Sequence, residues 1–160
     1  MITWLTDTGI GKFTMTFLIS MLPVVELRLG LPYGIAIGLN YPLALLAAVA
    51  GNLLPVPFII LFIEDLLKWL RTKITKLDRF ITKIEQRGQA KSEMVTKYGK
   101  IGLCLLVAIP LPGTGAWTGA LVAALLKMRL RDAMPAIIIG VLIAAAIMTG
   151  VTFGIINLSI

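Results

Sequence analysis

Two of the four long apolar stretches in this sequence are broken near their middles by proline and glycine, and this contrast constrains the fold most. Residues 42–63 and 133–156 are long enough to cross a bilayer as single helices, which need roughly 20 apolar residues. Residues 13–40 and 101–126 contain dense proline and glycine, which interrupt helices and leave halves too short to cross. We therefore predict two re-entrant hairpins that alternate with two transmembrane helices, the first of them kinked by its prolines.

The placement of lysine and arginine favours this arrangement over four simple spans, which are the alternative. Ten of the 15 basic residues lie between Lys68 and Lys100, as expected for a cytoplasmic segment. Basic residues also flank 101–126 on both sides, so a hairpin keeps both flanks in the cytoplasm. Each hairpin is then followed by one span, in opposite orientations. This order predicts an inverted repeat, which many secondary transporters share.

The composition indicates an all-α integral membrane protein in which residues 1–160 form a single domain. Hydrophobic residues make up 58% of the chain and charged residues 14%, against about a quarter charged in soluble domains. The net charge of +7 does not indicate nucleic-acid binding, because the basic residues flank apolar segments. There is no histidine, no phosphate-binding loop and only one cysteine, Cys104. We expect no metal, no cofactor and no enzymatic activity.

Residues 64–100 are polar but carry apolar residues at intervals of three or four, which predicts an amphipathic helix. We expect this helix to end at Gly88 and a shorter helix to end near Gly99. Such a basic helix is expected to lie on the anionic leaflet. A dimer contact or a regulatory arm is the alternative. The apolar stripe consists of Leu66, Leu70, Ile74, Leu77, Ile81 and Ile84.

Glu26 and Arg28 are charged residues inside the first broken stretch. A charge at the bilayer centre costs about 2.5–3.5 kcal/mol, so neither side chain should face lipid. Alternation of Val and Leu with polar or small residues predicts a non-helical tip with one polar side. Arg28 is the candidate to bind an anionic group, and Glu26 is the candidate to bind a proton, because burial disfavours a charged carboxylate. Alternatively, both hold the tip closed through backbone groups or each other. The structural residues of this tip are Pro23, Gly30 and Pro32.

The second broken stretch contains the sequence PLPGTGAWTG, in which we expect a helix to restart near residues 114–117. The N-terminus of that helix exposes N–H groups and can receive an anion. The alternative is that the glycines only allow close helix packing. The candidate binding residues are Thr114, Trp117 and Thr118, and the structural residues are Pro110, Pro112, Gly113 and Gly115.

Two further polar residues interrupt apolar sequence. Asn52 lies within the first span and needs hydrogen-bond partners, so it either braces a hairpin or contacts the substrate. Asp132 stands next to Arg129 and Arg131 at the start of the second span. We expect Asp132 to form a salt bridge at the membrane surface.

At these residues the sequence resembles the family of putative small multi-drug export proteins. The resemblance rests on PVVELRLGLPYGIA, GNLLPVP and PLPGTGAWTGALVA and covers most of residues 20–156. It implies two re-entrant hairpins, each packed with a spanning helix, and export of small molecules. The family is similar to the DedA superfamily, which implies translocation of lipid phosphates, often coupled to protons. Glu26 matches the acidic position expected there, but the second tip lacks the arginines that DedA relatives carry.

The sequence therefore predicts a multi-pass transporter of the cytoplasmic (inner) membrane, surrounded by membrane lipids. The expected substrate is an amphipathic or anionic small molecule or a lipid phosphate, coupled to protons and bound where the hairpin tips meet. A lipid scramblase without ion coupling and a membrane scaffold without transport are the alternatives. Because 160 residues are few for a transporter, we expect a homodimer.

Overall fold

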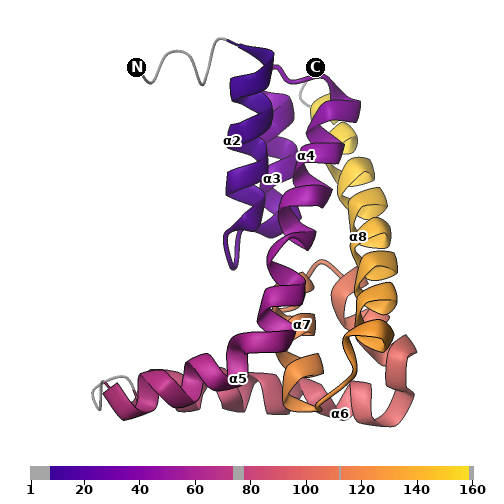
Figure 1. The fold of residues 1–160 in the computed structure, drawn as a ribbon. Coiled ribbons are helices and arrows are strands. Elements are labelled where there is room, and N and C mark those ends of the chain that lie inside the picture. Colours follow the sequence, from indigo (N-terminus) through magenta and orange to yellow (C-terminus); the bar gives the residue numbers. More distant parts are fainter. Residues whose placement is uncertain (1–7, 74–77, 112, 159–160) are drawn as a thin grey trace.

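The computed structural model describes residues 8–73, 78–111 and 113–158, and every regular element in this part of the chain is an α-helix. α8 runs the length of the molecule, beside the α2, α3 and α4 group at one end and α7 and the end of α6 at the other (Figure 1). The helices in chain order are α2 (Gly9–Met21), α3 (Glu26–Ala36), α4 (Tyr41–Leu53), α5 (Pro55–Lys73), α6 (Asp78–Ala108), α7 (Ala116–Leu125) and α8 (Leu130–Leu158).

α2 and α3 form a helical hairpin, which we call the first hairpin, and residues 22–25 are its turn, the first tip. The two helices approach closely because Gly30 of α3 faces Ser20 of α2: a Cβ at Gly30 would lie 1.8 Å from the Ser20 hydroxyl oxygen. The Ser20 hydroxyl donates to the carbonyl of Thr16 at 2.8 Å, so this polar side chain is satisfied within its own helix. Small residues at such contacts are typical of helix pairs in membranes.

The prediction of a non-helical tip through Pro32 is wrong, because the helix resumes at Glu26 and contains Arg28, Gly30 and Pro32. Only Pro23 of the tip residues lies in the turn. A helix satisfies nearly all of its backbone groups internally, whereas an extended segment at depth in a bilayer would leave them unpaired. The period-two alternation in the sequence instead reflects small residues of α3 that face α2.

The end of α6 and α7 form the second hairpin, with residues 109–115 as the second tip. α6 is bent at Gly99, whose backbone (φ 58, ψ −133) is not helical, so the hairpin begins at Lys100. The predicted break at Gly99 is thus confirmed, but the predicted helix end at Gly88 is wrong. Gly88 is buried within α6 and lies against Leu125 of α7, which explains a small residue there without any chain break.

Two helices are long and apolar enough to cross a membrane, over Tyr41–Leu67 and Leu130–Gly154. The first combines α4 with much of α5, and only Leu54 separates the two helices. Pro55 and Pro57 follow at once, and proline removes a backbone donor of the helix, so the helical hydrogen bonding is interrupted here, although Leu54 itself keeps helical backbone angles. The second is α8, which includes all of residues 133–156.

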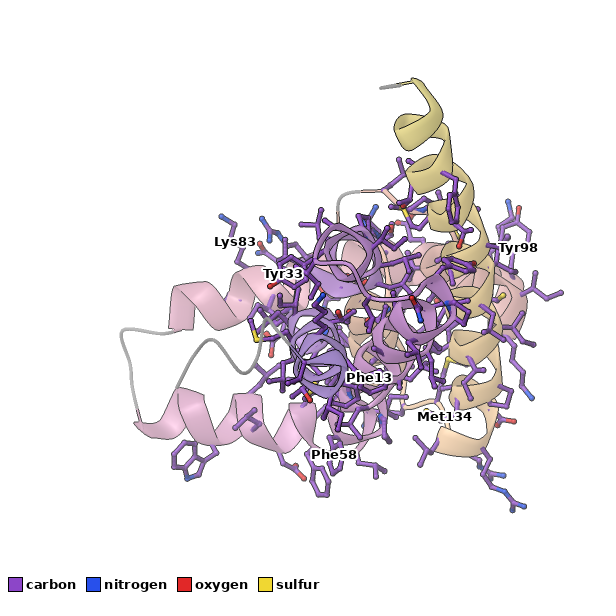
Figure 2. The ribbon with its side chains drawn as sticks, turned by 90° about the horizontal axis from the view of Figure 1, so that it is seen from above. Phe13, Tyr33, Phe58, Lys83, Tyr98 and Met134 are labelled. Carbon is purple, nitrogen blue, oxygen red and sulfur yellow. The ribbon has the colours of Figure 1, made fainter. Side chains whose placement is uncertain are left out.

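The end of α5 and the start of α6 extend sideways from the bundle as an arm (Figures 1 and 2). Its described basic side chains, such as Lys83, are exposed. Of the predicted apolar stripe, Leu66 is half-exposed at 48% and Ile84 is partly buried. The side chains of the other four stripe residues lie outside the described part of the chain: Leu70, Ile74, Leu77 and Ile81.

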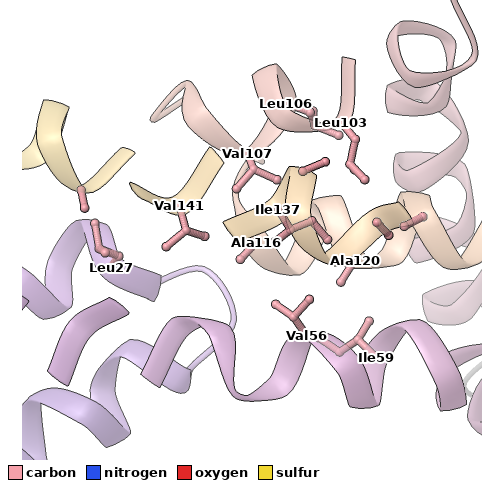
Figure 3. Packing of buried hydrophobic residues seen from close by; sticks show 14 of the residues in the cluster. Leu27, Val56, Ile59, Leu103, Leu106, Val107, Ala116, Ala120, Ile137 and Val141 are labelled. Carbon is pink, nitrogen blue, oxygen red and sulfur yellow. The ribbon is translucent and has the colours of Figure 1, made fainter. Parts of the chain in front are cut away.

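The main apolar core lies where the second hairpin, α5 and α8 meet, directly beneath the first tip (Figure 3). Leu27 at the start of α3 belongs to the same cluster, so the core continues into the first hairpin. Many other large apolar side chains are exposed, for example Leu46 at 58% and Ile139 at 53%. Exposed apolar surface on the two long apolar helices is what a lipid environment requires. The fully buried core residues here include Val56, Leu103, Ala116, Ala120, Ile137 and Val141.

Candidate functional site at the meeting of the two tips

The two hairpins point toward each other, and their tips meet midway along the molecule (Figure 1). Hydrogen bonds between residues more than 80 positions apart in the sequence join the tips. Two charged side chains of the first hairpin, Glu26 and Arg28, provide most of these bonds. The site therefore consists of the first turn of α3, the second tip and the start of α7.

Glu26 is 4% exposed and is the only charged side chain fully buried in the described part of the chain. Its Oε1 accepts a hydrogen bond from the backbone N–H of Trp117 at 3.0 Å. Trp117 is the second residue of α7, a position whose N–H lacks a partner within the helix. The residue before α7 is Gly115, which has no side chain to cap the helix. Glu26 therefore caps α7 from the other hairpin, and its negative charge faces the positive end of the helix dipole.

Gly115 provides the space for this carboxylate. A Cβ at Gly115 would lie 2.0 Å from Oε2 of Glu26, far inside contact distance. The backbone of Gly115 also has φ 123, which side chains rarely allow. The sequence prediction that Gly115 is a structural residue of the tip is consistent with both facts. A helix restart near residues 114–117 is confirmed, because α7 begins at Ala116.

Arg28 lies two residues after Glu26, in the same first turn of α3, and binds the carbonyl groups of the second tip. Nη2 donates to the Thr114 carbonyl at 2.6 Å and to the Thr114 hydroxyl at 2.8 Å, and Nη1 donates to the Leu111 carbonyl. The planar guanidinium suits several acceptors at once. No ion pair joins Arg28 to Glu26 directly, although both belong to the described chain. Of the two structural alternatives, contact with backbone groups is therefore observed, and direct pairing is not.

Trp117 adds a third link between the tips. Its indole N–H donates to the carbonyl of Met21 at 3.1 Å. Met21 ends α2, so this bond satisfies one of the carbonyls that a helix leaves unpaired at its C-terminus. Each hairpin thus caps a helix end of the other.

The structure does not bring every candidate residue into this contact. Thr118 is half-buried and makes no hydrogen bond to the first tip among the described residues. Gly113 is exposed with open space around its Cα, and Pro112 lies outside the described part of the chain. Pro23 and Pro110 lie in the turns themselves, whereas Gly30 and Pro32 lie along α3 away from the second tip.

Asn52 is buried at the end of α4, and its Oδ1 has no hydrogen-bond partner. The neighbouring Gly51 packs against the backbone of Phe17 in α2, so this part of α4 adjoins the first hairpin. Asn52 does not brace that hairpin through its Oδ1. A buried acceptor without a partner is uncommon in proteins, so this oxygen is available to a ligand.

Sequence reasoning missed the acceptors that Met21 and Leu111 contribute as backbone carbonyls. It expected free N–H groups at the start of α7, but not that Glu26 of the first hairpin would accept from them. Backbone groups leave little trace in side-chain identity. The available signal was the pair of turns itself, because each break in a helix must free carbonyls and N–H groups.

The comparison of the sequence with protein families identifies a family. Residues 26–147 match the family described as putative small multi-drug export protein. The chain belongs to this family. The match begins at Glu26 and covers the whole second hairpin, so it includes Glu26, Arg28 and their partners at the second tip, but not Met21. No curated protein and no solved structure matches the chain. Family membership and the two apolar helices together make this a membrane protein, in a family named for export rather than catalysis.

Proposed function

We propose that this protein is a secondary transporter of the cytoplasmic membrane, coupled to protons, that moves an amphipathic or anionic molecule or a lipid phosphate. The observation that carries the proposal is the pair Glu26 and Arg28, which joins two helix-breaking tips midway along a membrane protein, with Glu26 buried. Charged side chains at such depth are costly and mark transport pathways more often than packing. The export family to which the chain belongs points the same way.

The proposed topology has both hairpins re-entrant and related as an inverted repeat, with the tips near the midplane and a relation to the DedA superfamily. The opposed directions of the two hairpins support it (Figure 1). Cysteines placed singly at Lys97 and Arg131, in a Cys104→Ser background, test it. Both should react with a membrane-impermeant maleimide from the cytoplasmic side. Reaction from opposite sides would mean that the second hairpin crosses the bilayer.

Proton binding to Glu26 is the proposed opening step. The ionised carboxylate is attracted by the N-terminus of α7 and accepts its N–H bond. A protonated carboxyl loses that charge and is a poorer acceptor, so the contact between the tips weakens. In the proposed cycle, proton binding at Glu26 thus favours separation of the tips, and proton release favours closure.

Arg28 then becomes available to the substrate. In the closed arrangement its donors are engaged by three acceptors of the second tip. Once the tips separate, the guanidinium must find another acceptor or remain an unpaired charge at depth. A phosphate or carboxylate offers the planar pair of oxygens that it fits best. This requirement favours an anionic head group over a neutral or cationic substrate.

Asn52 is proposed as a second substrate contact, since its Oδ1 is buried without a partner. A substrate that donates a hydrogen bond to this oxygen would satisfy it. Asn52→Ala should then weaken substrate binding by about 1–2 kcal/mol while leaving the free energy of unfolding unchanged or improved. A large loss of stability in Asn52→Ala would instead assign Asn52 to bracing.

Transport by the purified protein in proteoliposomes tests the proposal, with an NBD-labelled lipid phosphate and an anionic amphipathic dye as probes. We expect flux that increases with an imposed pH gradient. Glu26→Gln should remove this dependence on the gradient, and Arg28→Gln should lower flux of both probes. Glu93→Gln, an exposed acid on the arm, is the matched control and should behave like the unmodified protein.

Three results would contradict the proposal in different ways. Lipid movement in both directions without any effect of the gradient would indicate a scramblase. A scaffold would be indicated by no flux of either probe, together with cells that show a normal phenotype when they carry the double variant Glu26→Gln and Arg28→Gln. An unchanged pH dependence in Glu26→Gln would remove that residue from proton coupling while leaving transport itself in place.

A further inference from the structure

A groove of about 310 Å³ lies on the outer surface between the second hairpin and α8, away from the tips. Ile101 and Leu105 line it from α6, and Pro135 and Ile139 line it from α8. Ile101, Leu105 and Ile139 are exposed at 69%, 44% and 53%. Because α8 is one of the two helices able to cross the membrane, this apolar groove faces the lipid phase.

One end of the groove is charged. Lys100 and Asp132 form an ion pair there at 2.7 Å, with side chains 63% and 42% exposed. Arg129 and Arg131, both exposed, lie close enough to interact with the same Asp132 carboxylate. One carboxylate is therefore accompanied by three cations, of which Lys100 forms the ion pair with it. Asp132 thus forms the expected salt bridge, although with Lys100 rather than with its neighbours in sequence.

From this charged end, the apolar part runs along α8 from Asp132 to Ile139, about 10 Å at 1.5 Å per residue. The site is therefore positive at the level where the apolar span begins and apolar further into the bilayer. We infer that this groove binds one anionic phospholipid of the cytoplasmic leaflet. Its phosphate would lie at Lys100 and Arg131, and one acyl chain would lie between Ile101 and Ile139. Charge complementarity selects this occupant over a zwitterionic lipid or a second copy of the chain.

Lipid retention by the intact protein tests the inference. The protein is taken from bilayers of equal phosphatidylglycerol and phosphatidylcholine into mild detergent, and bound lipids are counted by native mass spectrometry. We expect one phosphatidylglycerol to be retained in preference to phosphatidylcholine. The double variant Lys100→Gln and Arg131→Gln should lower its retention about tenfold, as expected when two cations beside an anionic head group are removed.

The matched control is Lys83→Gln with Lys91→Gln, which removes the same charge from exposed positions on the arm. It should leave retention within about twofold of the original. Thermal unfolding of both double variants checks that each is folded. An equal loss in both would mean that net charge alone attracts the lipid, and it would overturn the inference of a specific site.

Cys104 gives an independent measurement, because this half-buried residue lines the apolar part of the groove. Alkylation of Cys104 with N-ethylmaleimide fills the groove and should displace the retained lipid. The same treatment of Cys104→Ser should have no effect. Retention that survives alkylation would overturn the inference. So would efficient cross-linking of Cys104 between two copies in phosphatidylglycerol vesicles, which would assign the groove to a dimer contact.

Discussion

The first hairpin contributes charged side chains to the contact between the tips, and the second hairpin contributes mainly backbone groups. Glu26 and Arg28 come from the first turn of α3, whereas their partners are N–H and carbonyl groups of residues 111–117. Only the Thr114 hydroxyl is a side-chain partner. The two hairpins thus have similar shapes but different chemical roles.

This difference explains why the second tip needs no arginine of its own. Carbonyl oxygens freed by its turn already provide a negative region, and the start of α7 provides a positive one. The first tip supplies the Arg28 cation for these carbonyl oxygens and the Glu26 anion for the start of α7. A second pair of charges would add a desolvation penalty without adding partners. The comparison predicts that changes at the second tip act through space and backbone shape, and changes at the first tip act through charge.

Gly115→Ala should have the largest effect. Its Cβ would overlap the Glu26 carboxylate and its φ of 123 would be strained, so we expect a loss of about 3 kcal/mol or more. Unfolding by SDS titration in mixed micelles measures the change. Gly113→Ala is the control, because it also has positive φ but has open space around it. Equal losses in the two variants would show that backbone strain, not space for Glu26, is decisive.

Arg28→Gln should have the next largest effect, a loss of about 2–3 kcal/mol by the same measurement. The carbonyls of Leu111 and Thr114 would lose a charged donor, and hydrogen bonds to charged groups contribute most to stability. Arg28→Lys should recover only part of this loss, because an ammonium group lacks the planar arrangement of donors. Arg87→Gln, at an exposed position of α6, serves as the control. Full recovery by lysine would mean that charge alone matters at Arg28.

Glu26→Ala should destabilise the protein by about 2 kcal/mol, because the Trp117 N–H loses its acceptor. Glu26→Gln keeps an oxygen that can accept this bond but removes the charge at the helix N-terminus. We expect it to lose about half as much. Comparing unfolding of the two variants at neutral pH separates hydrogen bond from charge. If they are equally unstable, the charge and not the acceptor holds the tips together.

Thr114→Val should have the smallest effect, about 1 kcal/mol, because one hydroxyl bond to Arg28 and the local bonds of the turn are lost. Thr118→Val is its matched control within the same segment. Thr118 makes no hydrogen bond to the first tip, so we expect no loss of stability. A greater loss of stability in Thr118→Val than in Thr114→Val would mean that the Thr118 hydroxyl, and not the Thr114 hydroxyl, supports the contact between the tips.

Much of the helical organisation could be predicted from the sequence. Dense proline and glycine marked both turns, because these residues interrupt helices wherever they occur. The secondary structure of the first tip was predicted wrongly from its alternating pattern. Small residues at Gly30 and Gly34 face α2 and give the same alternation as an extended strand. Local pattern cannot distinguish the two cases, because it does not include the neighbouring helix.

The sequence by itself determined the two long apolar helices, the two breaks and the two charges that lipid would not tolerate, since these follow from local composition and the cost of charge in hydrocarbon. Only the tertiary structure decided that Glu26 caps α7 and that Arg28 binds the second tip, more than 80 residues away. Their partners are mainly backbone atoms, which every residue possesses. Which backbone groups are free, and which charge reaches them, depends on how the hairpins pack.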